Sequence, residues 1–200
     1  VGQFSVMPLE EGVRVRFLGE LQDGSICASF ESASTNANVD LRSFDGVEFR
    51  QISLPEFNTR GAELVCVRET ARGDLWLGTS SGIILVRPSS GTVEFHGKEQ
   101  GLATHRITVL TDVGEGRIWC GTTSRAYEYN SQRWVLRLMA PDRVNSIVPA
   151  LGSLWVGTSL GVYRLFKDSW ILHREGEGLP VGVHTLKLSP SDQLWAGTSG

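Results

Sequence analysis

The sequence lacks several features that would place it in a definite functional class. It has no run of about eighteen apolar residues, so no segment is expected to span a membrane. It has no signal peptide, and because it begins with "VGQFSV" rather than Met we expect a mature or excised piece of unstated compartment. It has neither a Lys/Arg cluster nor an acidic tail, and its net charge of −3 disfavours a nucleic-acid partner.

Cysteine is scarce, which disfavours metal sites and disulfide frameworks. The three cysteines, Cys27, Cys66 and Cys120, are an odd number at wide spacing and form no CxxC or Cys/His cluster. We therefore expect no metal site. Each cysteine is interpreted as a small apolar core group in a strand. A disulfide between two of them stays open at this point.

Catalytic motifs are also absent. The sequence contains no G-x-S-x-G, HExxH or phosphate-binding loop. The recurring Asp23, Asp74 and Asp192 are expected in turns between first and second strands, and residues spaced one per repeat do not flank one bond as a glycosidase pair must. We expect no catalytic residue and no cofactor. The alternative is a propeller lyase or hydrolase whose catalytic residues lie outside this chain.

The sequence does contain one string repeated four times. "LWLGTSSG" at 75–82 returns as "IWCGTTSR" at 118–125, "LWVGTSLG" at 154–161 and "LWAGTSG" at 194–200. The tryptophans lie 43, 36 and 40 residues apart, and a period near 40 is typical of solenoids and propellers. Because a catalytic motif normally occurs once, the string is interpreted as a building unit.

Each period contains four short strand patterns. After Ala62 they are "ELVCVRET", "LWLGT", "IILVRP" and "TVEFHG", separated by turns such as "ARGD" and "SSG". Four strands in about 40 residues predict an all-β chain, a β-propeller of four-stranded antiparallel blades. We expect blades at 14–54, 62–98, 105–138 and 143–174, with partial blades at 1–8 and 183–200, in one propeller region over 1–200.

The repeated residues are expected to hold neighbouring blades together. A tryptophan on each second strand would fill the space between blades, and in the first blade Cys27 takes its place. A glycine two residues later lets the backbone approach a neighbour closely, and the next threonine can cap the turn through its hydroxyl. These residues are Trp76, Trp119, Trp155, Trp195, Gly78, Gly121, Gly157, Gly197, Thr79, Thr122, Thr158 and Thr198.

These strings carry a resemblance to a known family. "LWVGTSLGVYRLF", followed by "EGEGLP" and "VHTLKLSPSDQLWAGTSG", resembles the two-component regulator propeller repeat. The blade at 105–138 departs from it because "TSRAYEY" lacks the paired glycines, and the match at 14–54 is weak. The resemblance implies a periplasmic sensor propeller of a bacterial, dimeric receptor.

The family implies further parts of such a receptor. They are a transmembrane helix and a kinase or cyclase output, and the ligands of such propellers are often oligosaccharides. On this basis a homodimeric parent receptor is expected, with membrane contact only through parts missing from this chain.

The strand count leaves two architectures open. The chain offers one terminal strand, four blades and half a blade. We expect a fragment of a larger propeller, with a small five-bladed ring as the alternative. As a fragment the chain is an open arc with exposed strand edges, which favour pairing or aggregation.

The candidate ligand-binding residues lie on one expected face. It holds the turns between second and third strands and the connections between blades, and loops on a rigid scaffold often carry function. The candidates are Ser81, His105, Ser124, Arg125, Arg143 and Ser159. Arg125 stands where sister blades have glycine, and its guanidinium suits a carboxylate or a sugar hydroxyl.

Each candidate also has a simpler interpretation. Arg125 can be a solvated side chain, His105 an exposed loop residue, and Arg143 the partner of Asp142 in a surface ion pair. Tryptophans on the expected outer strands, "RW" at 133–134 and "SW" at 169–170, are interpreted as core residues rather than a sugar-stacking platform. We expect a non-catalytic ligand-binding sensor, with a protein–protein interaction scaffold as the alternative.

Overall fold

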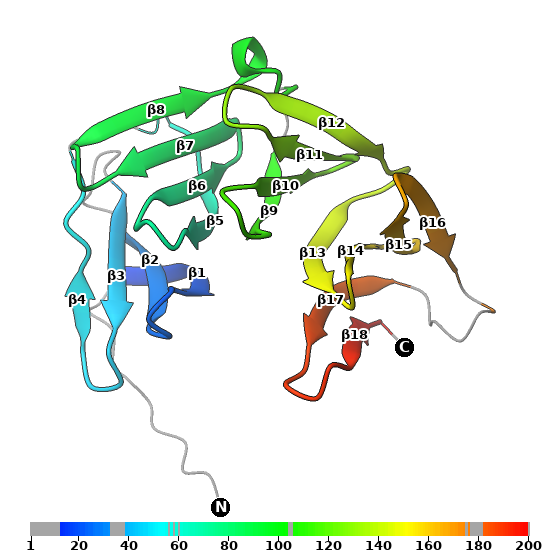
Figure 1. Ribbon diagram of the computed structural model, residues 1–200. Helices are drawn as coiled ribbons and strands as arrows, with labels where there is room; N and C mark the ends of the chain where they lie inside the picture. The colour runs from blue at the N-terminus through cyan, green and yellow to red at the C-terminus, as the bar shows by residue number, and fades with distance from the viewer. Residues whose placement is uncertain are drawn as a thin grey trace, which may run out of the picture.

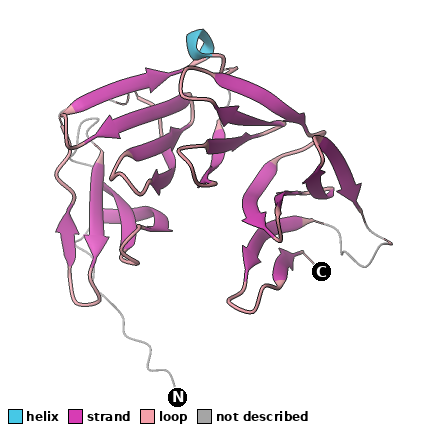
Figure 2. Cartoon of the chain, in the orientation of Figure 1, coloured by secondary structure: helices cyan, strands magenta, loops and turns pink. Residues whose placement is uncertain are grey.

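The structure is a computed structural model of the chain. It describes residues 13–32, 39–55, 57, 59, 61–103, 106–174, 176 and 182–199. The expected partial blade at 1–8 lies outside the described residues. Figure 2 shows antiparallel strands throughout, with one short 3-10 helix, η1 (Lys98–Gln100). None of the described segments forms a helix with the length and apolarity that crossing a bilayer requires.

The strands form four four-stranded sheets and one two-stranded sheet, named I to V in chain order. Sheet I contains β1 (Val13–Glu20), β2 (Ile26–Ser32), β3 (Asp40–Phe44) and β4 (Phe49–Gln51). Sheet II contains β5 (Leu64–Glu69), β6 (Leu75–Thr79), β7 (Gly82–Arg87) and β8 (Thr92–His96). Sheet III contains β9 (Ile107–Asp112), β10 (Ile118–Thr122), β11 (Arg125–Tyr129) and β12 (Trp134–Met139).

The last two sheets differ in size. Sheet IV contains β13 (Val144–Ala150), β14 (Ser153–Thr158), β15 (Gly161–Phe166) and β16 (Ser169–His173). Sheet V contains β17 (Val183–Leu188) and β18 (Leu194–Thr198). Within every sheet each strand pairs antiparallel with the next in sequence. The predicted all-β propeller fold with four-stranded antiparallel blades is therefore confirmed.

The sheets stand side by side around a common centre. Figure 1 shows the first strand of each four-stranded sheet innermost and the fourth strand at the outer rim. Successive first strands contact one another, as β5 does with β9 and β9 with β13. Sheets I and V lie at the two ends of an open arc in Figure 1, so the described sheets do not close a ring.

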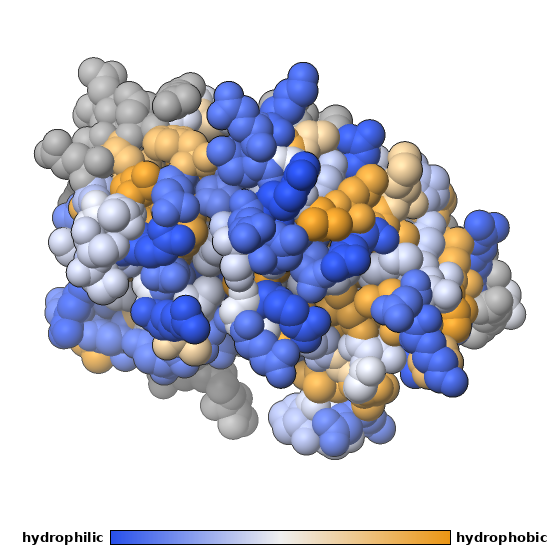
Figure 3. Space-filling model, turned by 45° about the horizontal axis from the view of Figure 1, so that its top comes forward, coloured by the Kyte–Doolittle hydropathy of each residue, from blue (hydrophilic) through white to orange (hydrophobic). Residues whose placement is uncertain are grey.

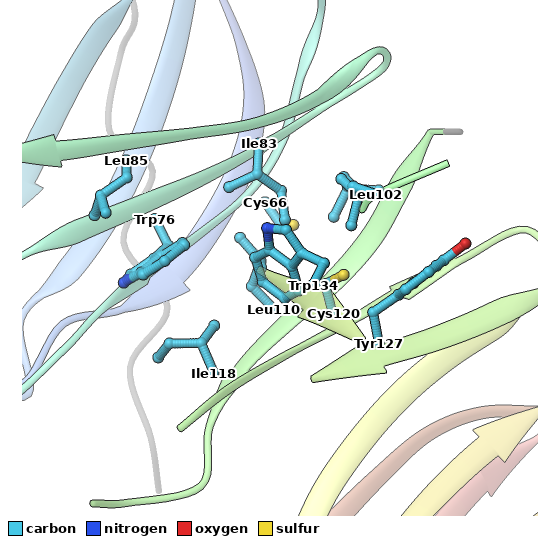
Figure 4. Close-up of a cluster of buried hydrophobic side chains, with 11 residues drawn as sticks. Cys66, Trp76, Ile83, Leu85, Leu102, Leu110, Ile118, Cys120, Tyr127 and Trp134 are labelled. Carbon is cyan, nitrogen blue, oxygen red and sulfur yellow. The ribbon is translucent and has the colours of Figure 1, made fainter. Parts of the chain in front are cut away.

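Each pair of neighbouring sheets encloses its own hydrophobic core. Between sheets II and III, Trp76 packs with Ile118, Tyr127 and Trp134, which all belong to sheet III (Figure 4). Because one buried aromatic ring removes about 150–250 Å² from water, a single tryptophan supplies much of the apolar contact between two narrow sheets. Trp76 is 5% exposed.

The other inter-sheet cores repeat this arrangement. Trp119 of sheet III packs against Val156 and Tyr163 of sheet IV and is 3% exposed. In sheet I the smaller Cys27 occupies the same slot and packs with Leu75 and Leu77 of sheet II. In sheets I, II and III the repeated residue is thus set against the next sheet.

Trp195 departs from the expected inter-sheet role. Its side chain is 64% exposed, although its string, LWAGT, matches those of the buried tryptophans. The physical reason is positional: the described chain places no sheet beyond sheet V, so nothing covers this ring. Trp155 is intermediate in burial, because it faces only the two strands of sheet V.

Gly78 and Gly121 lie two residues after a tryptophan, where the first strands of two sheets crowd the second strand. A Cβ atom on Gly78 would lie 2.4 Å from Cys66 Sγ in its own sheet and 2.8 Å from Ile107 Cγ2 in the next. A Cβ atom on Gly121 would lie 2.5 Å from Val144 Cγ1. Real carbon atoms do not approach so closely, so only glycine fits at these points.

The threonine that follows fixes the turn to the third strand. Thr79 Oγ1 donates to the Gly82 carbonyl at 2.9 Å and accepts from the Ser81 N–H at 3.2 Å. Thr158 makes the same pair of contacts with Gly161 and Leu160, at 3.0 and 3.3 Å. A hydroxyl that both donates and accepts in this way satisfies two backbone groups of a tight turn.

The cysteines are free and buried, as interpreted from the sequence. Burial raises the pKa of the Cys27 thiol to about 11 and that of Cys66 to about 12. Burial also raises the pKa of Cys120 well above its usual value. Thiolate, the reactive form, is therefore suppressed at neutral pH, and these residues act as core groups.

The surface is largely polar. Figure 3 shows hydrophilic side chains over most of one view, interrupted by separate hydrophobic patches. Large exposed apolar side chains include Leu136 and Met139 on β12 and Ile171 on β16, both outer strands. Single apolar side chains are ordinary on protein surfaces.

Candidate functional site

The strand order divides the loops between two faces of the arc. The connection face holds the turns between second and third strands and the described residues of the links between sheets, which include 52–55, 97–103 and 140–143. The turn face holds the turns between first and second strands and between third and fourth strands. Asp23, Asp74 and Asp192 lie on the turn face, in the turns expected for them.

The candidate residues from the sequence lie at the connection face, but in different sheets. Ser81 lies in sheet II, Ser124 and Arg125 in sheet III, and Arg143 and Ser159 at the start and in the middle of sheet IV. His105 lies outside the described residues.

Most of these candidates take part in local turn structure. The Ser124 N–H donates to Thr122 Oγ1 at 3.4 Å, and Ser159 Oγ accepts from Asn145 Nδ2 at 3.4 Å. The Arg143 N–H, rather than its guanidinium, donates to Asp142 Oδ1 at 2.6 Å. These contacts place the side chains on the face but do not by themselves form a ligand site.

Ser81 lines a small cavity at this face. The cavity measures about 170 Å³ and also involves Thr59, Phe95 and His96. His96 is 4% exposed, and its Nδ1 accepts a hydrogen bond from the Trp134 indole N–H at 3.2 Å. Burial lowers the pKa of His96 below its usual value, although Glu94 opposes the shift.

A larger cavity opens at the opposite, turn face, where sheets II and III meet. We name it the II/III cavity; it measures about 310 Å³. Sequence reasoning placed ligand loops on the connection face and therefore missed it. The residues that line it include Arg72, Asp74, Trp76, Arg87, Asp112 and Tyr129.

Tight turns hold the charged groups at the rim of the II/III cavity. The turn carrying Arg72 and Asp74 is closed by the Thr70 N–H, which donates to the Asp74 carbonyl at 2.9 Å. Gly73 supplies the positive φ of 78° that this turn needs. From sheet III, Asp112 Oδ1 accepts from the Gly114 N–H at 2.8 Å.

An ion-pair network fixes one guanidinium in the wall. Arg87 donates from Nη1 to Glu94 Oε1, and its Nε lies 3.9 Å from Asp74 Oδ2. The hydrogen bond from Arg87 holds the pKa of Glu94 below its usual value. With Asp112 and the exposed Arg72 at the rim, the cavity presents both hydrogen-bond donors and acceptors.

Aromatic rings form the inner wall of the II/III cavity. Tyr129 stands edge-to-face on Trp76, with ring centroids 5.1 Å apart, and Trp134 packs behind both at 5.8 Å from Trp76. Burial raises the pKa of the Tyr129 hydroxyl, so the phenol stays protonated and keeps an O–H donor. The Thr70 hydroxyl, also in the wall, is buried and has no hydrogen-bond partner among the described residues.

A second cavity, between sheets III and IV, also opens at the turn face. It measures about 560 Å³, and much of its wall is aliphatic, from Val113, Leu154, Leu165 and Leu188. The II/III cavity has the denser set of convergent polar groups, which is the feature that gives a pocket its specificity. The described residues contain no cluster of His, Cys, Asp or Glu that could hold a metal ion.

Both outer tryptophans are packing residues. Trp134 is 1% exposed and belongs to the II/III core. Trp170 of β16 packs edge-to-face with Trp119 at 6.2 Å, and its indole N–H donates to the Arg137 carbonyl at 2.8 Å. Each ring therefore ties its sheet to the preceding one.

Comparison with known proteins places the chain among solved structures of similar fold. No family model matches it, and no curated protein matches it. The extracellular domain of the hybrid two-component system BT3049 from B. thetaiotaomicron matches with a TM-score of 0.73 and 14% identity, over 98% of this chain and 28% of that one. The extracellular domain of the one-component system BT4673 from the same organism matches with a TM-score of 0.63 and 16% identity, over 92% and 32%.

A third similar structure has a different setting. It is YCF48 bound to D1 peptide, with a TM-score of 0.64 and 12% identity over 97% of this chain and 65% of that one. At these identities the likeness is one of fold. The chain spans about a third or less of the two extracellular domains.

Proposed function

We propose that this chain is part of an extracytoplasmic sensor propeller of a bacterial signalling receptor and that it binds a carbohydrate without catalysing a reaction. Two observations support the setting: the repeat resembles the two-component regulator propeller repeat, and two similar structures are extracellular domains of such systems. In this proposal the chain acts before a kinase or cyclase, in a homodimeric parent receptor.

The proposal of a carbohydrate ligand is based on the II/III cavity. A sugar ring has C–H faces, which pack on an aromatic ring such as that of the partly buried Tyr129, and hydroxyls, which both donate and accept. Arg72 supplies donors and Asp112 supplies acceptors at the rim. A volume of about 310 Å³ lies at the lower end of the range for small-molecule sites, which suits a mono- or disaccharide unit.

Ligand binding in the II/III cavity would change the populations of receptor arrangements and would not involve a chemical reaction. Sheets II and III contribute opposite walls, so a ligand that bridges them favours arrangements in which the two sheets are held together. A receptor with two arrangements would then shift toward the one that binds more tightly.

Thermal unfolding with a panel of oligosaccharides tests the proposal. A ligand present at about 100 times its Kd adds about 2.7 kcal/mol of apparent stability. We expect Arg72→Ala to abolish the shift and Arg125→Ala on the connection face to retain it. The reverse result would indicate that the ligand binds at the connection face.

Two further outcomes would overturn the sensor proposal. Absence of a shift with every sugar, together with a stable protein complex, would favour the interaction-scaffold alternative. Formation of product from a polysaccharide would show that the chain belongs to an enzyme.

A further inference from the structure

The cavity of about 560 Å³ between sheets III and IV, named here the III/IV cavity, differs in its lining from the II/III cavity. Figure 1 shows sheets III and IV side by side, with sheet II before them and sheet V after them, so this cavity does not lie at an end of the arc. Its volume lies well inside the range of about 300–1,000 Å³ that is typical of small-molecule sites.

The wall of the III/IV cavity is largely apolar. Leu154 is 9% exposed and belongs to the core between sheets III and IV. Val113, Leu165 and Leu188 also line the cavity and are only half-buried. Because an apolar ligand would remove the rest of their surface from water, this wall suits a hydrocarbon body.

Arg117 is an exposed cation in the lining of the III/IV cavity, with donors left for a ligand. Its Nη1 lies 3.7 Å from Glu128 Oε1 and its Nη2 lies 3.9 Å from Glu115 Oε2. Both distances are too long for a hydrogen bond. Glu128 is held instead by Arg137, whose Nε and Nη2 lie 2.8 and 2.7 Å from its Oε2.

The turn between β15 and β16 adds a second cation to the lining. Lys167 is exposed there, and its Nζ lies 5.3 Å from the centroid of the Phe166 ring. Asp168, the next residue, is the one carboxylate among the residues that line this cavity. With Arg117 and Lys167 against Asp168, the charge of the lining is positive.

Trp119 supplies a further donor on the same side as Arg117. It lines the III/IV cavity, and its indole N–H has no hydrogen-bond partner among the described residues, whereas those of Trp155 and Trp170 donate to backbone carbonyls. Glu128 lies opposite Trp119 in the pairing of β10 with β11 and also faces Arg117. These side chains therefore share the face of sheet III that is turned to sheet IV.

We propose that the III/IV cavity binds a small apolar carboxylate of the class of a medium-chain fatty acid. Its hydrocarbon chain lies against Val113, Leu165 and Leu188. Its carboxylate accepts from the Arg117 guanidinium and is attracted by Lys167. A carboxylate only accepts hydrogen bonds, so it matches a lining rich in donors, whereas an ammonium group would bring more donors and the same charge.

Binding of octanoate to the complete chain tests the proposal, with octylamine and octan-1-ol as matched ligands. Calorimetry measures the affinity, and 19F NMR on chain labelled with 5-fluorotryptophan locates the site. The Trp119 resonance is assigned with Trp119→Phe. We expect octanoate to bind at least about tenfold more tightly than octylamine and to move the Trp119 resonance but not that of Trp195. From butyrate to octanoate the affinity should rise about fourfold for each added CH₂.

Exposed charges at the III/IV cavity provide variants that should keep the fold. Arg117→Gln and Lys167→Gln should each weaken octanoate binding by about two- to fivefold. Asp168→Asn should strengthen it by a similar factor, because it removes a charge of the same sign as the ligand. Lys98→Gln, the matched control on the connection face, should leave the affinity unchanged.

Four results would contradict the proposed site. Octanoate could fail to bind or leave the Trp119 resonance in place, or octylamine could bind as tightly as octanoate. An affinity that does not rise with chain length would show that the hydrocarbon does not enter the cavity. Weaker binding of octanoate to Asp168→Asn would show that its carboxylate lies elsewhere.

Discussion

At the scale of single residues, His96 is a buried histidine whose hydrogen bond requires the neutral ring. Its Nδ1 accepts from the Trp134 indole at 3.2 Å, so its proton sits on Nε2, 3.5 Å from Glu94 Oε2. Desolvation lowers the pKa of His96 below 6.5, and the nearby Glu94 offsets only part of this shift.

This shift predicts a loss of stability in mild acid. Below about pH 6.5 the unfolded chain takes up a proton that folded His96 resists, so the free energy of unfolding falls as pH falls. The slope from one group is at most about 1.4 kcal/mol per pH unit. Urea unfolding from pH 5 to 8 should show this slope, and His96→Asn should remove it. An identical slope in both proteins would contradict the assignment.

Protonation of Glu94 does not account for the predicted pH slope of the free energy of unfolding. Its pKa is lowered from 4.5, chiefly by the hydrogen bond from Arg87. The stability it contributes is therefore present above about pH 4.5 and is lost only at lower pH. Glu94 therefore adds no slope of its own between pH 5 and 8.

Gly121 and Gly197 form a matched pair of repeat positions. A Cβ at Gly121 meets Val144 Cγ1 of the next sheet at 2.5 Å and Val109 Cγ1 at 2.7 Å, whereas a Cβ at Gly197 meets only Thr185 Cγ2, at 2.8 Å. We expect Gly121→Ala to lower the free energy of unfolding by about 1–3 kcal/mol through overpacking. Gly197→Ala should change it by less than about 1 kcal/mol. Equal losses in denaturant titrations would mean that the neighbouring sheet is not the cause.

At the scale of the element, the turn between the second and third strands of sheet III differs from the corresponding turns of sheets II and IV. Gly82 and Gly161 have φ of 145° and 144°. A Cβ on Gly82 would lie 2.7 Å from the His96 carbonyl oxygen, and a Cβ on Gly161 would lie 2.3 Å from the His173 carbonyl oxygen. Arg125 occupies this position in sheet III, where β12 pairs with β11 through a register shift between Ala126 and Tyr127. β8 and β16 pair without such a shift.

The turn difference predicts unequal tolerance of the same side chain. Gly82→Ala forces an L-residue into a φ of 145° against a backbone carbonyl, so it should cost about 1–3 kcal/mol. Arg125→Ala should cost less than about 1 kcal/mol, because this position already accepts a Cβ. Thermal unfolding compares the two, and a larger loss for Arg125→Ala would refute the explanation.

The repeat string predicts its local structure well and its surroundings poorly. Trp76 and Gly78 follow from a pattern within one strand, and the strand, the turn and the fold are all local consequences of that pattern. The exposure of Trp195 depends instead on which sheet comes next. The II/III cavity arises where Arg72 of one sheet meets Asp112 of another, a juxtaposition that no single string encodes.

At the scale of the whole molecule, stability is carried by interfaces between neighbouring sheets. Among the described residues the main contacts of each sheet are with the sheets before and after it, as in repeat architectures, whose stability is approximately a sum of nearest-neighbour terms. Sheets II and III have neighbours on both sides, whereas sheet V has a neighbour on one side only. Protection against hydrogen exchange should therefore be highest in β6 and β10 and lowest in β17 and β18.

The contribution of neighbouring sheets to stability can be measured at two tryptophans of the repeat. Trp119 is 3% exposed and bridges sheets III and IV, whereas Trp195 is 64% exposed at the end of the arc. Trp119→Ala should lower the free energy of unfolding by about 3–5 kcal/mol, because it leaves a cavity between two sheets. Trp195→Ala, the same change in the same string, should cost less than about 1 kcal/mol. Denaturant unfolding measures both values; comparable losses would mean that the tryptophan stabilises its own sheet, and that the joints between sheets are made by other residues.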